Sequence, residues 1–217
     1  MLKKNKGLMI LTSVIILLPV VAGLLLWDKL PEAVPAHWNI NGEPDGWSSR
    51  PVAVFGLPLL LLAVHWLGLW IVGQDRKNKH TNAKAKALLL WLVPAISLIG
   101  NGSVYAAVLG ADVARNRLVF LFLGLLFTVI GNYLPKCKQN YTIGIKIVWT
   151  LNSEENWNAT HRMAGKVWMA GGVLLMLCGF VPAEIGSVML PVTLGLMVGA
   201  PILYSWQFSR RKEGDRK

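Results

Sequence analysis

The sequence predicts an all-α, polytopic membrane protein with six transmembrane helices and both termini in the cytoplasm. Hydrophobic residues make up 54% of the 217 residues, and mean hydropathy is +0.48. Charged residues make up only 15%, well below the roughly 25% of an ordinary soluble domain. Long uncharged runs separate these charges, and the basic residues gather between alternate runs. A soluble fold could not cover so much apolar surface.

Six uncharged runs are the predicted spans, at residues 7–27, 51–74, 87–111, 118–135, 167–183 and 185–209. Most reach the length of about 20 residues that a helix needs to cross the hydrocarbon core. Two are shorter, but Arg117 and Lys166 at their ends can extend to the membrane surface. The runs lack the alternation of barrel strands. The first is too long for a signal peptide and is expected to remain as a helix.

The basic residues predict the orientation of the chain. Of 22 lysines and arginines, 18 lie before the first run, in the second and fourth connections, or after the last run. This positive-inside pattern puts both termini in the cytoplasm and residues 28–50 outside. Topology and contact with membrane lipid therefore account for the net charge of +11, and no direct binding of nucleic acid is predicted.

Two connections are long enough to carry function. The predicted division gives residues 1–75 to a first helix pair with its outer loop. Residues 76–217 form a four-helix region with a long cytoplasmic loop at 135–165. Within that loop, residues 139–150 are expected to be extended, and a helix starting after Ser153 is expected to continue into the fifth span. Glu154 and Glu155 fall in its first turn, where the helix dipole favours acids. The two tryptophans on this helix, Trp157 and Trp168, are expected at the level of the lipid headgroups.

The outer segment "HWNINGEPDGW", residues 37–47, contains two turn signals, Asn-Gly and Asp-Gly. It is predicted to form a compact loop or a short hairpin against the membrane. His37, Glu43 and Asp45 could converge there, and His37 with Asp45 could bind a divalent metal. The simpler interpretation is that His37 and Asp45 hydrogen-bond backbone groups and fix the loop. No other cofactor is predicted.

The same segment resembles a short membrane-associated region of the DUF1648 type. The matching residues are Pro31, Pro35, His37, Asn39, Gly42 and Asp45.

Residues 131–172 resemble the signature region of the SdpI family. The matching pieces are Gly131 to Tyr133, Pro135-Lys136, Asn140 to Gly144, Trp149 to Leu151, Glu154 to Trp157, Thr160 to Arg162 and Gly165-Lys166. Where the family often has Arg-Thr-Pro-Trp, this chain has Lys146-Ile147-Val148-Trp149. Together, the two resemblances span most of the chain.

The resemblance implies a multi-pass protein of the bacterial cell membrane that confers immunity to a secreted toxic peptide. It also implies a receptor that holds a cytosolic repressor at the membrane. The outer loop would meet the toxin through His37, Asn39, Gly42, Glu43 and Asp45. The inner loop would meet the repressor through Asn132, Tyr133, Pro135, Lys136, Asn140, Thr142, Gly144, Trp149, Glu155, Asn156, Trp157, His161 and Arg162.

Two other functions compete with immunity. A metal-dependent membrane enzyme could use His37 outside, or His161 with nearby acids inside. However, the sequence has no His-Glu-x-x-His motif, and no paired carboxylates lie in its spans. A transporter is weakened by spans with almost no charge and by the lack of an internal repeat. His65 stands alone in the second span and is expected to be hydrogen-bonded inside the bundle. The chain is therefore predicted to be a binding protein and not an enzyme.

Overall fold

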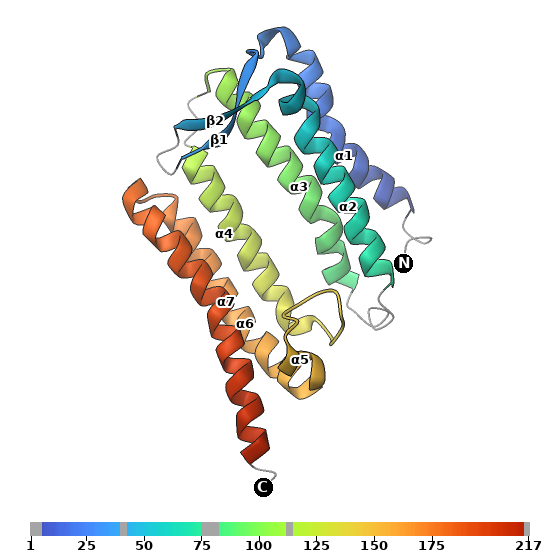
Figure 1. Cartoon of the computed structure of the whole chain (residues 1–217), viewed down its shortest axis with the longest axis vertical. Coiled ribbons are helices and arrows are strands. Elements are labelled where there is room, and N and C mark those ends of the chain that lie inside the picture. Colours follow the sequence, from blue (N-terminus) through green and yellow to red (C-terminus); the bar gives the residue numbers. More distant parts are fainter. Residues whose placement is uncertain (1–5, 40–42, 75–82, 112–114, 215–217) are drawn as a thin grey trace. The chain divides into compact units, whose positions relative to one another are not determined.

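The computed structural model describes residues 6–39, 43–74, 83–111 and 115–214, and these form two compact units (Figure 1). The first unit contains three helices and a two-stranded sheet, and the second contains the remaining helices. The division predicted from the sequence, at residue 75, puts the third helix with the C-terminal region. In the structure this helix packs with the first two.

The first unit consists of three long helices and a hairpin. Its elements are α1 (Lys6–Leu25), η2 (Trp27–Lys29), β1 (Ala33–Trp38), β2 (Pro44–Ser49), η3 (Val52–Gly56), α2 (Leu57–Gln74) and α3 (Ala83–Val108). Strands β1 and β2 are antiparallel, which confirms the predicted hairpin. The strands are the one departure, among the described residues, from an otherwise all-α fold. Leu30 and Val34 anchor the base of the hairpin, because both are buried against Val54 and Tyr105.

Side-chain hydrogen bonds hold the three helices of this unit together. They join Thr12 to His65 Nε2 at 3.0 Å, the Ser97 hydroxyl to the Ile16 carbonyl at 2.8 Å, and the Tyr105 hydroxyl to the Pro19 carbonyl at 3.0 Å. In lipid, where the hydrophobic effect does not draw helices together, such bonds and close packing hold a bundle. His65 is thus hydrogen-bonded inside the bundle, as predicted.

The second unit contains four helices and the long inner loop. Its elements are α4 (Arg115–Tyr133), η5 (Leu134–Lys136), α5 (Val148–Asn152), α6 (Glu154–Cys178) and α7 (Ala183–Gly214). The prediction of extended chain over 139–150 is wrong at its end, where α5 begins. The Thr150 hydroxyl accepts from the Ile147 N–H and donates to the Ile145 carbonyl. These local bonds favour a helical turn over a strand.

Helices α4 and α6 contact each other through paired glycines. A Cβ placed on Gly131 would lie 2.9 Å from the Gly165 carbonyl, and one placed on Gly165 would lie 2.8 Å from the Gly131 carbonyl. Seven residues away on each helix, Gly124 and Gly172 meet in the same way. The backbones touch because no side chain separates them. We call these four glycines the glycine seam.

Five described helical segments are long and apolar enough to cross a membrane: Lys6–Leu25, Val52–Gln74, Leu90–Val108, Arg117–Lys136 and Ala183–Lys212. They correspond to five of the six predicted spans, and the chain is a multi-pass membrane protein. The predicted span at 167–183 differs, because its apolar residues belong to α6, which begins with a polar half. That half carries Glu154, Glu155, Arg162 and Lys166.

Candidate functional site

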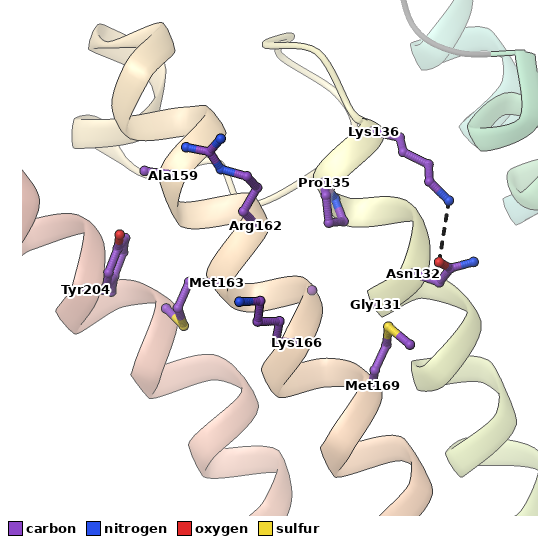
Figure 2. A pocket seen from close by; sticks show the side chains of 11 residues that line it. Gly131, Asn132, Pro135, Lys136, Ala159, Arg162, Met163, Lys166, Met169 and Tyr204 are labelled. Carbon is purple, nitrogen blue, oxygen red and sulfur yellow. Dashed lines mark hydrogen bonds between the residues drawn. The ribbon is translucent and has the colours of Figure 1, made fainter.

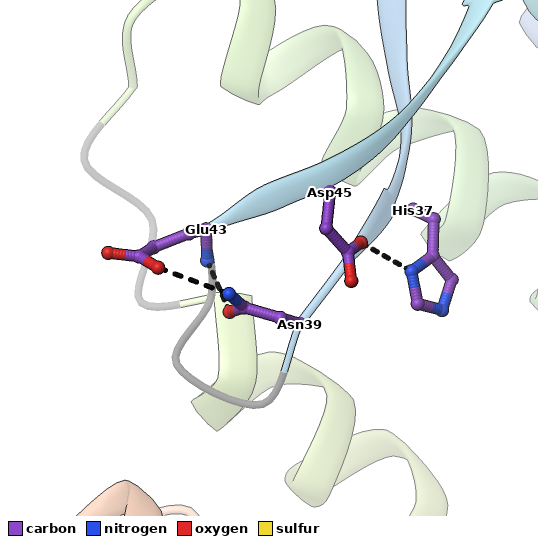
Figure 3. Close-up of polar contacts among 4 residues, drawn as sticks. All are labelled: His37, Asn39, Glu43 and Asp45. Atoms are coloured by element: carbon purple, nitrogen blue, oxygen red, sulfur yellow. Dashed lines mark hydrogen bonds and ion pairs between the residues drawn. The ribbon is translucent and has the colours of Figure 1, made fainter.

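The outer hairpin presents its polar side chains on its surface. His37 Nδ1 lies 2.5 Å from Asp45 Oδ1, and the two side chains are 73% and 43% exposed. Beside them, the Asn39 side chain donates to Glu43 Oε2 at 3.1 Å and accepts from the Glu43 N–H at 3.0 Å (Figure 3). His37 and Asp45 therefore bond to each other instead of to the backbone. The predicted residue Gly42 lies outside the described residues.

The metal site predicted at this hairpin stays a prediction. Two ligand atoms of a tetrahedral ion would lie about 3.3 Å apart, whereas His37 Nδ1 and Asp45 Oδ1 are 2.5 Å apart, so these two atoms bond each other and do not share an ion. Glu43 is bonded to Asn39 and points away from His37 (Figure 3). Among the residues that the structure describes, no three His, Cys, Asp or Glu side chains form a group able to hold an ion.

The inner loop is built around the buried amide of Asn140. Its Nδ2 donates to the Lys138 carbonyl at 2.8 Å and to the Ile143 carbonyl at 2.9 Å. Its Oδ1 accepts from the backbone N–H groups of Thr142 at 2.8 Å and Ile143 at 2.6 Å. All the hydrogen-bonding capacity of the amide is used on backbone. Asn140 therefore determines the shape of the loop.

His161 joins this loop to α6. Its Nδ1 bonds the Trp157 carbonyl at 2.8 Å, and its Nε2 accepts from the Ile145 N–H at 3.0 Å. One nitrogen donates and the other accepts, so the imidazole is neutral. Burial lowers the pKa of His161 to about 4, and the bond to the Trp157 carbonyl offsets only part of this effect.

Gly144 lies directly against the ring of His161. Its φ is +117°, and a Cβ there would lie 2.5 Å from His161 Nε2. Any other residue would be strained at this φ and would displace the histidine.

Trp157 is completely buried and does not lie among lipid headgroups, so the expectation for this residue is wrong. Its ring stacks on His161, with centroids 4.1 Å apart, and its Nε1 donates to the Cys137 carbonyl at 2.7 Å. Because the Trp157 ring packs against the inner loop, the face that was expected to meet lipid is covered. Burial also raises the pKa of the neighbouring Cys137 thiol, which keeps it protonated.

The first turns of α6 are fixed to α7. Ser153 caps α6, as predicted, with its hydroxyl accepting from the Asn156 N–H. The Asn156 amide donates to the Ser205 carbonyl at 2.9 Å and accepts from the Ser205 hydroxyl at 2.7 Å. Glu155 forms an ion pair with Lys212. The predictions did not include Ser205, and nothing in the sequence indicates that it would meet Asn156.

Two cavities open on this unit, and several predicted residues line them. A cavity of about 580 Å³ is bordered by Asn132, Pro135, Lys136 and Arg162, together with Lys166 and Tyr204, which the predictions did not include (Figure 2). We call it the basic cavity. A second cavity, of about 460 Å³, is lined by Trp149, Asn156, Phe208 and Lys212, among others. The Lys136 Nζ lies over the Tyr133 ring, 5.0 Å from its centre.

Comparison with known proteins finds matches to two parts of the chain, one that contains most of the inner loop and one that contains the outer hairpin. Residues 136–205, which include most of the inner loop, match the SdpI/YfhL protein family. Residues 14–62, which include the outer hairpin, match a domain of unknown function, DUF1648.

One relative is similar to this chain from end to end. It is the "Immunity protein SdpI" of Bacillus subtilis strain 168, 26% identical over 217 residues, which cover 99% of this chain and 100% of the relative. No solved structure matches the chain significantly.

Proposed function

We propose that this protein is an integral membrane immunity protein that protects the cell from a secreted antimicrobial peptide. The observation that carries the proposal is the end-to-end similarity to an immunity protein, which spans both the hairpin and the inner loop. The neutral, internally bonded His161 and the direct contact of His37 with Asp45 do not favour the alternative of a metal-dependent enzyme.

The proposed topology has six spans, with both termini in the cytoplasm and the hairpin outside. Helix α6 has 25 residues, so it extends about 37 Å at 1.5 Å per residue, enough to cross the membrane. Its polar first half, including Arg162 and Lys166, would lie at the cytoplasmic surface. The positive-inside distribution of lysine and arginine supports this orientation.

The hairpin is the element proposed to meet the peptide. His37 and Asp45 form an exposed charge-capable pair, and Trp47, which is 59% exposed, adds an apolar surface beside them. An exposed aromatic side chain next to a polar pair is typical of a binding surface. A peptide arriving from outside would meet these side chains without any rearrangement of the bundle.

The inner loop is proposed to hold a cytosolic repressor. Its interior is filled by its own hydrogen-bonded side chains, so it would offer a stable surface. Tyr141 is 59% exposed on that surface, and Val148, which is 68% exposed, lines the second cavity. A partner that binds there would contact this loop and the end of α7.

The test is survival of a sensitive Gram-positive strain exposed to the peptide that the B. subtilis relative neutralises. We expect protection by the parent, and loss of protection for His37→Ala and Asp45→Ala at equal membrane levels. Glu32→Ala is the matched control, because Glu32 is exposed near the hairpin and its backbone carbonyl, which the substitution keeps, accepts from the Arg50 N–H. A well-expressed parent that does not protect would contradict the proposal.

Cysteine labelling with a membrane-impermeant maleimide tests the topology. With six spans, Ser49→Cys is labelled in intact cells, whereas Arg211→Cys is labelled only after permeabilisation. If α6 does not cross, the chain has five spans and Arg211→Cys is labelled in intact cells. Lys138→Cys, in the inner loop, is the control for cytoplasmic exposure. The native cysteines, Cys137 and Cys178, are buried, so they give little background.

A further inference from the structure

The basic cavity lies where α4 ends and the polar half of α6 begins. The side chains of Asn132 and Lys136 come from the end of α4 and the following turn, and Arg162 and Lys166 come from successive turns of α6 (Figure 2). Tyr204 of α7 closes one side. Within the second unit, three helices therefore contribute to one opening.

Charge in this cavity has a single sign. Lys136, Arg162 and Lys166 line it, and no carboxylate is among its described lining residues. The ion pairs formed by the described residues, His37 with Asp45 and Glu155 with Lys212, leave these three cations without an acidic partner. Lys136 is further oriented by Asn132 Oδ1, 3.4 Å from its Nζ. Three positive charges around one opening favour the binding of an anion there.

Apolar side chains also line the cavity. Ala159 and Met163 lie among the cations along α6, and Met169 lies beyond Lys166. Arg162 and Met169 are seven residues apart, which is about 10 Å along a helix. The sequence of α6 runs from the inner loop toward its apolar half, so the cations lie nearer the loop and Met169 lies deeper in the span. A ligand that fills the cavity would need an anionic head and an apolar tail.

We propose that the basic cavity binds one anionic phospholipid of the membrane leaflet on the inner-loop side. The phosphate is held by Lys136, Arg162 and Lys166, with the Asn132 amide as an additional donor. An acyl chain lies against Met163 and Met169. Arginine can bond two phosphate oxygens at once, and basic pockets between membrane helices suit phospholipid headgroups. The bound lipid would fix α4 and α6 at the membrane surface beside the inner loop.

The experiment measures lipid retained by the purified full chain in detergent micelles, by native mass spectrometry. The micelles contain equal amounts of phosphatidylglycerol and phosphatidylcholine with identical acyl chains. The parent is compared with the triple variant Lys136→Gln, Arg162→Gln, Lys166→Gln. The control triple variant is Lys138→Gln, Lys146→Gln, Arg210→Gln, which removes the same charge from exposed positions outside the cavity.

We expect the parent to prefer phosphatidylglycerol. Each basic residue near an anionic lipid contributes roughly five-fold in affinity, so the cavity variant should bind on the order of a hundred-fold more weakly. The control variant should keep most of the preference. If the triple variant does not fold, the single variant Lys166→Gln, at an exposed position, should still lose roughly five-fold.

Three results would overturn the proposal. The first is a parent with no preference between the two lipids, which would leave an acidic protein segment as the occupant to seek. The second is an equal loss in the cavity and control variants, which would indicate diffuse surface charge. The third is displacement of the lipid by inorganic phosphate at equal concentration, which would mean that the acyl chain contributes nothing and that a free anion is the ligand.

Discussion

The outer hairpin and the inner loop both contain histidine, asparagine and acidic residues, yet they use them in opposite ways. In the hairpin, His37 and Asp45 are exposed and bond each other. In the inner loop, Asn140 and His161 are buried, and they bond mainly backbone groups. The same residue types therefore form an exposed polar surface in one region and the loop's internal structure in the other.

This difference separates stability from recognition. Leaving a buried polar group without its partner costs the full free energy of desolvation, whereas an exposed group can bond water instead. Changes in the inner loop should therefore lower the free energy of unfolding. Changes in the hairpin should alter protection from the peptide and leave folding intact.

Asn140→Leu should have the largest effect on stability. It leaves two backbone N–H groups and two carbonyls of the loop without partners, which should cost about 3–5 kcal/mol. Thermal unfolding in detergent, together with trypsin cleavage at Lys138 and Lys146, measures the loss. Asn158→Leu is the matched control, because Asn158 is exposed on α6. An equally small effect of both variants would contradict the buried role of Asn140.

Acidification should destabilise the protein through His161. Its pKa is about 4 in the folded protein and 6.5 when unfolded, so its contribution to stability is complete above pH 6.5. It is lost as the pH falls toward 4, because only the unfolded state takes up the proton. Between pH 7 and pH 5 the loss should be about 2 kcal/mol. His161→Gln should flatten the pH dependence of unfolding, whereas His37→Gln should retain it.

Asp45→Asn should change stability by less than about 1 kcal/mol, because exposed ion pairs contribute little. Protection from the peptide should nevertheless fall sharply at unchanged membrane levels. Unfolding and survival assays on the same variant test whether protection is lost while stability is kept. A loss of stability as large as that of Asn140→Leu would remove the distinction between the two regions.

Glu155→Gln should have the smallest effect on stability. The ion pair with Lys212 lies on the surface, so its loss should cost a few tenths of a kcal/mol at low salt. In about 1 M salt, where charges are screened within about 3 Å, parent and variant should unfold alike. A salt-independent difference would indicate that Glu155 packs against neighbours instead of acting through its charge.

Sequence patterns predicted the elements that depend on local chemistry. Turn residues within 37–47 predicted the hairpin, although Asp45-Gly46 lies inside β2 and not in a turn. Ser153 with two following acids gave the start of α6. Uncharged runs gave five segments able to cross a membrane. Each of these features follows from residues close together in the chain, so the order of residue types is enough to indicate it.

Features that depend on distant partners could not be predicted. The sequence shows that Trp157 can sit at an interface, but not that the Cys137 carbonyl and the ring of His161 enclose it. Similarly, the spacing between Gly131 and Gly165 does not reveal that their backbones meet. Helix α6 joins a polar half and an apolar half in one continuous helix, which an uncharged run alone does not reveal.

The glycine seam has a mechanical consequence. Helices in backbone contact cannot rotate or slide past each other without driving a side chain into the partner, and packed interiors resist compression. Helices α4 and α6 should therefore behave as one stiff rod. At the far end of this rod, the Arg117 guanidinium donates to the Gly179 carbonyl at 3.2 Å. A displacement of the inner loop would therefore move that end of the helix pair by a similar distance.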